Sequence, residues 1–482
     1  MKKIFILLFS IVLWVGAYAN VEVYLLYAFY NSPEGPYVET YMSTIGESLV
    51  YKETQSGTYQ AEIEILLLFK QSGNIVHADK YSLFSPEIND ISGTKPNFVD
   101  VQRISLANGI YNFEIHVKDK NSESAGSIYA DIISVEFSDK DLSFGGIEFI
   151  ESVSKTTQET IISKNGYDII PYVSNFFPPN VEKLSFYIEL YNSDKVINDD
   201  FILRYYIENY ETSREIDKYS RFKKMSGKNI IPFIGELNIK DLPSGNYNLV
   251  LDIRDRENQS LKKEKYFFQR SNLVDENAEI AELVKEFDIY ATFSGEMSSI
   301  DSLVGYIKSL RPIANINEQR FIDHQVKGSS LGALQNFFVQ FWISRNNINP
   351  NDVWKEYNEQ IKYVNRLYQT SIRKGYETDM GVIYLKYGAP NSIYTSKHEP
   401  SAYPYEIWTY WKTPTETNRK FVFYNPNIVG KDFELLHSNA TGEVKAPNWE
   451  RMLQKRNNTF SNFDNLNADE SWGSRALEEF NK

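Results

Sequence analysis

The serines at positions 329 and 330 are the first candidates for chemistry, because Gly-Ser-Ser-Leu-Gly at residues 328–332 fits the G-x-S-x-G motif of serine hydrolases. In that motif the serine lies on a sharp turn between a buried strand and a helix. A helix is predicted after Ser330, but residues 321–326 have the pattern of an amphipathic helix rather than of a buried strand. Only His398 and His437 follow as candidate bases. We therefore expect Ser329 or Ser330 to cap a helix, and a serine hydrolase is the least favoured function.

Other reactive groups are scattered along the chain. The five histidines, at positions 77, 116, 324, 398 and 437, form no H-x-x-x-H pair, and the chain has no cysteine. The Asn- and Asp-rich residues 462–469 lack the glycine and the terminal glutamate of a calcium-binding loop. No phosphate-binding glycine motif occurs. The sequence thus predicts a protein that is not an enzyme and that holds no metal and no cofactor.

Polar and aromatic residues in the C-terminal half are better candidates for binding than for catalysis. Six of the seven tryptophans lie between positions 342 and 472. Two interpretations of residues 375–379 stay open. In the first, Gly375 ends a helix, the next aromatic ring fills a gap, and the polar residues accept hydrogen bonds at the start of a strand. In the second, these residues belong to a ligand site, whose candidate members are Tyr376, Thr378, Asp379, Tyr387, Trp408 and Trp411.

The elements that position these residues change from helices to strands along the C-terminal half. Apolar residues at steps of three and four predict helices behind Asp275, over residues 300–310, from Ser329 or Ser330 onward, and over residues 351–374. Alternating patterns predict strands over residues 382–387, 405–411 and 420–424, and a weaker one over 433–437. We expect an α+β domain over residues 275–440, with a small antiparallel sheet behind a helical layer.

The N-terminal half contains a repeat. Gly-Ile-Tyr-Asn-Phe-Glu-Ile-His-Val-Lys-Asp at residues 109–119 matches Gly-Asn-Tyr-Asn-Leu-Val-Leu-Asp-Ile-Arg-Asp at residues 245–255, at an offset of 136 (245 − 109). In both, apolar residues fall at every second position, which is the period of a strand with one buried face. The tyrosine in each can bury its ring and return its hydroxyl group to a nearby backbone group, as in a tyrosine corner.

Further strands surround each copy of the repeat. Strands are predicted over residues 127–137 and 263–269, and hairpins are predicted for 63–70 with a turn at 71–74 and for 184–191 with a turn at 192–194. The pattern predicts two tandem immunoglobulin-like β-sandwich domains, over residues 20–145 and 155–270. The polar, Thr-rich residues 153–163 are predicted to link them. Such domains are usually spacers, adaptors or protein-binding surfaces.

The first nineteen residues have the pattern of a cleaved signal peptide. Lys2 and Lys3 precede an apolar run over residues 4–15, and Ala-Tyr-Ala at 17–19 provides a cleavage site, so the mature chain is expected to begin at Asn20. The run is shorter than the roughly 20 apolar residues of a membrane-spanning helix. The formal charge of −13 becomes −15 once both lysines are removed, which disfavours nucleic acid as a partner. We expect the polar residues 441–482 to form a tail that stays flexible until it meets a partner, with Trp472 as its one large apolar anchor.

The motifs of the C-terminal half, taken in order, resemble the GWxTD domain of envelope proteins from Gram-negative bacteria. They are Phe-Trp at 341–342, Arg-Asn-Asn at 345–347, Tyr-Val-Asn at 363–365, Gly-Tyr-Glu-Thr-Asp at 375–379, Tyr-Leu-Lys-Tyr-Gly-Ala-Pro at 384–390 and Tyr-Glu-Ile-Trp at 405–408. The resemblance covers roughly residues 331–436. Tyr376 replaces the tryptophan that gives the family its name, and Asn346-Asn347 stand where the family tends to have Asp-Pro. The resemblance implies an envelope location and an architecture, but no reaction.

The favoured function is therefore that of an exported, non-enzymatic envelope protein that binds another protein or acts as a scaffold subunit of an outer-membrane or secretion assembly. The expected location is the periplasm or a face of the outer membrane. A carbohydrate- or peptidoglycan-binding module that uses the C-terminal aromatic residues is the alternative.

Overall fold

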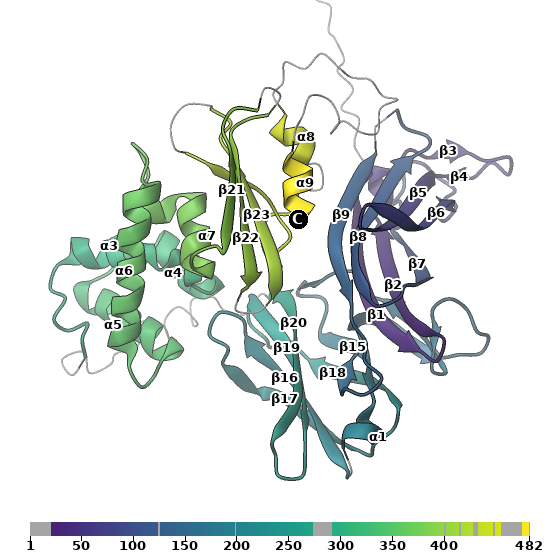
Figure 1. The fold of residues 1–482 in the computed structure, drawn as a ribbon, viewed down its shortest axis with the longest axis horizontal. Coiled ribbons are helices and arrows are strands. Elements are labelled where there is room, and N and C mark those ends of the chain that lie inside the picture. The colour runs from purple at the N-terminus through teal and green to yellow at the C-terminus, as the bar shows by residue number, and fades with distance from the viewer. Residues whose placement is uncertain are drawn as a thin grey trace, which may run out of the picture.

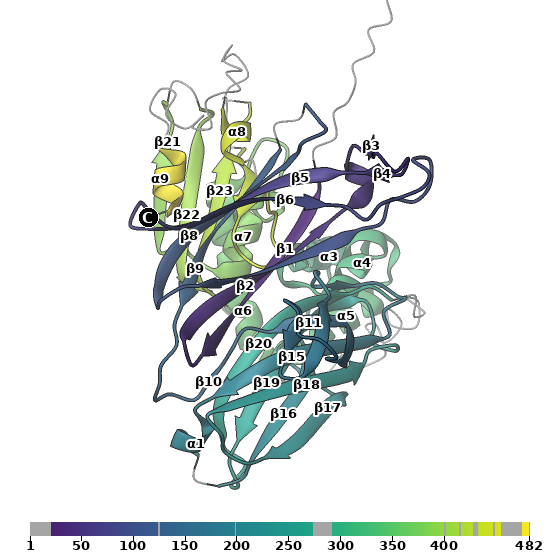
Figure 2. The same ribbon diagram turned by 90° about the vertical axis from the view of Figure 1, so that its right-hand side faces the viewer.

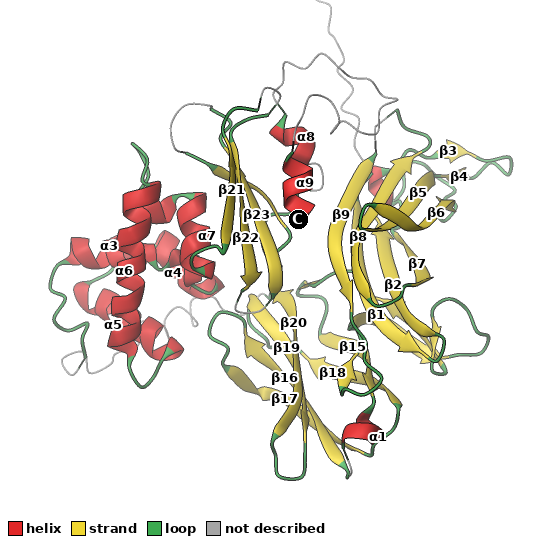
Figure 3. Cartoon of the chain, viewed as in Figure 1, coloured by secondary structure: helices red, strands yellow, loops and turns green. Residues whose placement is uncertain are grey.

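A computed structural model of the chain describes residues 21–123, 126–197, 199–272, 292–399, 402–413, 416–427, 432–446, 449–454 and 475–481. These residues form a first β part (21–135), a second β part (143–272) and a C-terminal part (292–481) of helices and a small sheet (Figures 1 and 3). The second β part lies below the other two in both views of the ribbon (Figures 1 and 2). No helix among the described residues is long and apolar enough to cross a membrane.

The first β part consists of two sheets with a shared core. One sheet has the order β1 (Val23–Ser32), β2 (Gly35–Thr44), β7 (Phe98–Ser105). The other has the order β6 (Asn74–Phe84), β5 (Glu62–Gln71), β8 (Gly109–Asp119), β9 (Ser127–Val135). A short 3-10 helix, η1 (Gly46–Ser48), and the small pair β3 (Lys52–Glu53) and β4 (Tyr59–Gln60) complete it. Alternate residues of both sheets meet in one cluster.

The second β part also has two sheets around one core. The six-stranded sheet has the order β10 (Ser143–Phe144), β15 (Lys183–Tyr191), β11 (Glu148–Lys155), β13 (Tyr167–Pro171), β12 (Ser163–Lys164), and β18 (Ile230–Asn238) pairs with β15. The five-stranded sheet has the order β14 (Phe176–Phe177), β20 (Ser260–Arg270), β19 (Gly245–Arg254), β16 (Phe201–Asn209), β17 (Glu215–Met225). Apolar residues of both sheets form the largest core of the molecule's described residues.

The repeat predicted from the sequence occupies equivalent strands, β8 and β19. The hydroxyl group of Tyr111 donates to the carbonyl oxygen of Ala107 at 2.8 Å, and that of Tyr247 donates to the carbonyl oxygen of Pro243 at 3.1 Å. The predicted return of each tyrosine hydroxyl to the backbone is therefore confirmed. The strands that follow, β9 and β20, are also where the sequence places them.

Two predictions for the β parts are wrong. Residues 153–163 are not only a linker, because Val153 continues β11 and Ser163 begins β12. Residues 184–191 do form a strand, but they are not the first half of a hairpin. Asn192 has a left-handed backbone (φ 61°) and starts a short helix, α1 (Ser193–Val196), which carries the chain to the opposite sheet.

The contact between the two β parts contains a buried group of charges. The Nζ atom of Lys164 lies 2.7 Å from Oε1 of Glu39 on β2 and 2.5 Å from Oε2 of Glu148 on β11. All three side chains are buried, among the apolar residues that join the sheet of β1 and β2 to the sheet of β11 and β15. Burial raises the pKa of Glu148 to about 7, although Lys164 opposes the change and Glu39 adds to it.

The C-terminal part begins with a helical layer. Its helices are α3 (Ile300–Ser309), α4 (Ile316–His324), α5 (Leu331–Arg345), α6 (Pro350–Tyr368) and α7 (Asp379–Tyr387), with 3-10 turns η3 (Arg311–Ile313), η4 (Val326–Gly328) and η5 (Gly375–Glu377). The predictions for α3 and α5 are confirmed. The helix predicted behind Asp275 lies outside the described residues.

A four-stranded antiparallel sheet follows, in the order β21 (Ser392–Ser396), β22 (Tyr405–Lys412), β23 (Thr417–Tyr424), β24 (Glu434–Ser438). Figure 1 shows it between the helical layer and the last helices, α8 (Trp449–Leu453) and α9 (Ala476–Asn481). The side chains of Trp449 and Phe480 are buried against it. The expectation of a flexible tail over residues 441–482 is therefore wrong for its described residues, and Trp472 lies outside them.

The strand predicted over residues 382–387 is wrong, because these residues belong to α7. The preceding helix, α6, also ends at Tyr368 rather than at residue 374. The physical reason is that α7 is buried on two sides. Leu385 packs into the core of the helical layer, while Met380 and Ile383 pack against the sheet. A helix covered on both sides lacks a single apolar stripe, so its sequence resembles the alternation of a strand.

Candidate functional site

Residues 375–379 form a tight connection between α6 and α7. A Cβ atom on Gly375 would lie 2.1 Å from the carbonyl oxygen of Val364 and 2.5 Å from the Cα atom of Asn365, both on α6. Only glycine fits this approach of backbone to backbone. The amide of Tyr376 also donates to Oδ1 of Asn365 at 3.3 Å. The glycine is thus needed for space, so its predicted role as the residue that ends α6 is wrong.

Thr378 begins α7 and links it to Gly375. Its Oγ1 atom accepts a hydrogen bond from the amide of Gly381 at 3.2 Å and donates one to the carbonyl oxygen of Gly375 at 2.7 Å. This is the N-cap arrangement that threonine favours. Gly381 is equally constrained, since a Cβ atom there would lie 1.8 Å from that same carbonyl oxygen. The polar residues therefore start a helix rather than the strand expected from the sequence.

Asp379 connects the helical layer to the sheet. Its Oδ2 atom accepts a hydrogen bond from the amide of Leu435 on β24 at 2.7 Å. The carboxylate also lies in the first turn of α7, where a negative charge interacts favourably with the helix dipole. The side chains of Thr378 and Asp379 are both engaged in holding the fold.

The aromatic candidates have three different environments. Tyr376 is buried in the core of the helical layer, where burial raises the pKa of its phenol to about 12. Trp408 is 1% exposed, donates to Glu406 through its indole N–H at 3.0 Å and packs with the sheet-side cluster. Tyr387 donates to Glu443 at 2.8 Å, and Trp411 is 67% exposed. The candidate residues therefore do not share one aromatic cleft.

A pocket of about 420 Å³ lies beside the motif, between the ends of α3 and α4 and the start of α7. Its lining combines apolar and charged residues: Lys308, Arg311, Pro312, Ile322, Asp323, Lys327, Tyr376, Glu377 and Val382. Ile322 and Tyr376 are buried, whereas Arg311 and Lys327 are exposed. The size falls within the range typical of ligand pockets, roughly 300–1,000 Å³.

The charges of this pocket are partly neutralised within it. The guanidinium group of Arg311 pairs with Asp323 through contacts of 2.9 and 3.1 Å. The carboxylate of Glu377 accepts the backbone amide N–H of Lys374 at 2.9 Å, which is a hydrogen bond and not an ion pair. The ammonium groups of Lys308 and Lys327 have no ion pair or hydrogen bond with any residue that the structure describes. The pocket thus offers two cationic groups above an apolar floor. No local sequence pattern marks this pocket, because residues 308, 327 and 376 converge only in the folded helical layer.

The serine motif does not form a nucleophile elbow. The residues before it are helical, in α4 and η4, where the elbow needs a strand. The Oγ atom of Ser329 donates to the carbonyl oxygen of Gln325 at 3.0 Å, and that of Ser330 accepts from the amide of Ala333 at 3.3 Å. Ser330 is the N-cap of α5, as predicted. Among the described residues, no group of three or more histidine, aspartate and glutamate side chains has the arrangement of a metal site.

The chain thus combines a β-rich N-terminal region of several sheets with helices and a small antiparallel sheet at its C-terminal end. Residues 259–454 match the GWxTD domain family, so this part of the chain is a GWxTD domain. No curated protein matches its sequence significantly.

Solved structures that match do so weakly. A glycosyl hydrolase family 2 member from Bacteroides cellulosilyticus is 10% identical, with a TM-score of 0.17, and the match covers 48% of this chain and 26% of that one. The CBD12 fragment of CALX1.2 is 12% identical, with a TM-score of 0.14, and the match covers 53% of this chain and 84% of that one. The chain therefore spans about a quarter of the hydrolase, and neither likeness carries an argument about function.

Proposed function

We propose that this chain is an exported, non-enzymatic envelope protein that docks another protein through the pocket beside Tyr376 and acts as a scaffold subunit. The observation that carries the proposal is the pair of lysines, Lys308 and Lys327, which line the pocket and lack ion-pair partners among the described residues. In a chain with a formal charge of −13, such a cationic spot is a specific feature rather than part of a general basic surface.

The partner segment that fits this pocket is an acidic peptide with one apolar side chain. Its carboxylates would pair with the two ammonium groups, and its apolar residue would pack on Ile322, Tyr376 and Val382. Charge complementarity at a rim sets specificity and the rate of association, while the apolar contact supplies the buried area. The GWxTD motif supports this site indirectly, because Gly375 and Thr378 fix the position of Tyr376 and the start of α7.

The two β parts support a role as spacers. We propose that each is an immunoglobulin-like sandwich, on the basis of two facing sheets around one core and a tyrosine bonded to the backbone before the repeated strand. Export is proposed from the charged, apolar and small-residue segments of residues 1–19. Sequencing the N-terminus of the protein purified from its own cells should yield Asn20 first, and retention of residues 1–19 would refute cleavage.

Photo-crosslinking tests the docking proposal. A photoreactive phenylalanine analogue at position 328, next to Lys327 and at a glycine whose added Cβ atom meets open space, should give a discrete crosslinked product in the full chain expressed in its own cells. That product should be lost when Lys308→Glu is added, because the substitution places a negative charge in the pocket. Lys355→Glu is the matched control, since Lys355 is an exposed lysine of the same helical layer whose contact is with Asp352. A product that survives Lys308→Glu, or no product at all, would overturn the proposed site.

A further inference from the structure

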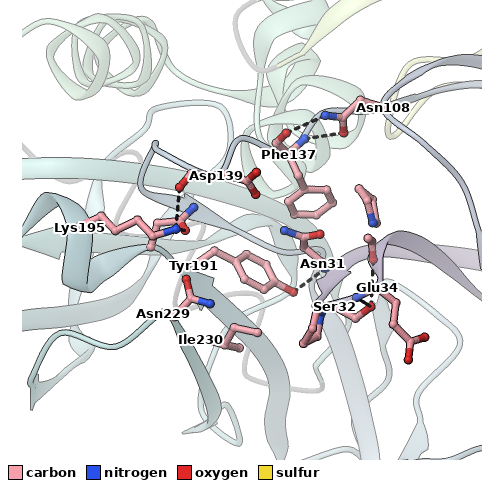
Figure 4. Close-up of a pocket in the computed structure, with 14 residues that line it drawn as sticks. Asn31, Ser32, Glu34, Asn108, Phe137, Asp139, Tyr191, Lys195, Asn229 and Ile230 are labelled. Atoms are coloured by element: carbon pink, nitrogen blue, oxygen red, sulfur yellow. Dashed lines mark hydrogen bonds between the residues drawn. The ribbon is translucent and has the colours of Figure 1, made fainter.

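A second pocket, of about 430 Å³, lies where the two β parts meet. Figure 4 shows its side chains around a hollow between the turn that joins β1 to β2, the segment that follows β9, and the end of β15. Neither the GWxTD domain match nor the pocket beside Tyr376 includes these residues. The pocket is therefore independent of the function proposed above.

The walls of this pocket are held in place by hydrogen bonds that cross between segments. The amide of Asn31 donates to the hydroxyl group of Tyr191 at 2.9 Å, which joins the first β part to the second. Asn108 exchanges two hydrogen bonds with the backbone of Phe137, at 2.7 and 2.9 Å. The side-chain amide of Asn192 donates to the carbonyl oxygens of Ser138 and Asp141. Because these contacts fix the loops without a ligand, binding would cost little ordering of the chain.

The lining chemistry selects a class of ligand. The pocket offers side-chain amides at Asn31 and Asn229, carboxylates at Glu34 and Asp139, and the ammonium group of Lys195. The two carboxylates outnumber the one ammonium group, so an anion is disfavoured. Few apolar side chains line it, so a hydrophobic ligand is disfavoured too. Among the described residues, the side-chain amides of Asn31 and Asn229 have no hydrogen-bond partner.

An aromatic surface completes the site. The rings of Phe137 and Tyr191 meet edge to face, with centroids 5.5 Å apart, and both line the pocket. Amides and carboxylates can each bond to a hydroxyl group, which both donates and accepts. Aromatic rings pack well against the C–H face of a sugar ring, which is apolar. We propose that this pocket binds a neutral mono- or disaccharide, with Asn31, Asn229 and the two carboxylates as hydrogen-bonding groups and Phe137 as the packing surface.

Titration of the intact protein with sugars tests the proposal. The probes are glucose, N-acetylglucosamine and cellobiose, with glucose 6-phosphate as the anionic control, each followed by isothermal titration calorimetry and saturation-transfer NMR. At least one neutral sugar should bind at millimolar concentration or better, and the phosphate should bind more weakly. Asn31→Ala and Asn229→Ala should each raise the Kd about fivefold, as expected for the loss of one hydrogen bond. Both variants should keep the thermal unfolding midpoint, because neither side-chain amide forms a hydrogen bond with a described residue and the backbone N–H of residue 31 is kept.

Trp411→Ala distinguishes this pocket from a site on the C-terminal aromatic residues. The exposed Trp411 lies on β22 and does not line this pocket, so its removal should leave the Kd unchanged. Loss of sugar binding in Trp411→Ala, unchanged binding in both asparagine variants, or no binding of any neutral sugar by the intact protein would each overturn the proposal.

Discussion

Replacing Gly381 with alanine should destabilise the connection at residues 375–379 and the start of α7 more than the small size of the added methyl group suggests. The added Cβ atom would lie 1.8 Å from the carbonyl oxygen of Gly375, and real Cβ atoms do not approach other heavy atoms below 3.0 Å. That carbonyl cannot turn aside freely, because it accepts hydrogen bonds from the amide of Thr378 at 3.2 Å and from its hydroxyl group at 2.7 Å.

The magnitude follows from these contacts. Moving the carbonyl sacrifices two hydrogen bonds of about 1 kcal/mol each. Overpacking adds about 1–3 kcal/mol, and the better helix propensity of alanine returns about 1 kcal/mol. The net loss in the free energy of unfolding should be roughly 2–4 kcal/mol. Gly305→Ala is the matched control, because Gly305 lies within α3 with no atom near its missing Cβ. It should stabilise the chain by up to about 1 kcal/mol.

Hydrogen-exchange mass spectrometry of the full chain measures this effect locally, together with urea unfolding. In Gly381→Ala, peptides covering α7 should exchange faster, while peptides from the two β parts should not change. In Gly305→Ala, the protection of α7 should equal that of the unchanged chain. If Gly381→Ala keeps both the protection of α7 and the midpoint of unfolding, the connection is not as tightly packed as we describe.

Three further predictions concern buried groups. Because the pKa of Glu148 is raised to about 7, the folded chain keeps a proton on Glu148 that the unfolded chain releases, so the free energy of unfolding falls as pH rises from about 4.5 to 7. In urea unfolding between pH 5 and 8, Glu148→Gln should therefore have a free energy of unfolding up to roughly 3 kcal/mol higher than that of the chain with Glu148. Burial lowers the pKa of His437 to about 4, and its Nδ1 atom accepts a hydrogen bond from the amide of Ala446 at 3.1 Å. The stability that neutral His437 contributes should therefore be lost as pH falls from 6.5 toward 4. Hydrogen exchange in α8 and α9 should become faster over this range, and this change should be absent in His437→Asn. Trp408→Ala should cost about 3–5 kcal/mol in unfolding free energy, whereas Trp411→Ala should change it by less than about 0.5 kcal/mol, and equal costs would refute the difference in burial.

Elements with one buried face could be predicted from the sequence. The start of α5 agrees with the prediction because the serine N-cap marks it locally, although residues 334–339 of this helix are all buried. The strand β8 alternates cleanly because one face meets a core and the other is partly exposed, whereas β19 keeps a similar apolar alternation although both of its faces are buried. The tyrosine hydrogen bonds were predictable for a related reason, since a buried phenol needs a polar partner close in the chain.

Elements buried on two sides, and contacts between distant segments, could not be predicted. The helix α7 has no single apolar stripe, so the spacing of its apolar residues does not indicate a helix. The ion group of Lys164, Glu39 and Glu148 joins residues that are far apart in the chain, and no local pattern marks it. Of the candidate site residues, Tyr376 lines a pocket, while Thr378 and Asp379 form hydrogen bonds within the fold. Lys308 and Lys327 reach that pocket only through helix packing, which no local pattern marks.

The identity of the peptide crosslinked to position 328 tests the central claim most directly. Mass spectrometry of the product should identify a segment of another exported protein that carries at least two acidic residues beside an apolar one. Such a segment would match the two lysines and the apolar floor of the pocket. A basic or uncharged segment, or a segment of this chain itself, would contradict the claim that the pocket beside Tyr376 docks an acidic partner.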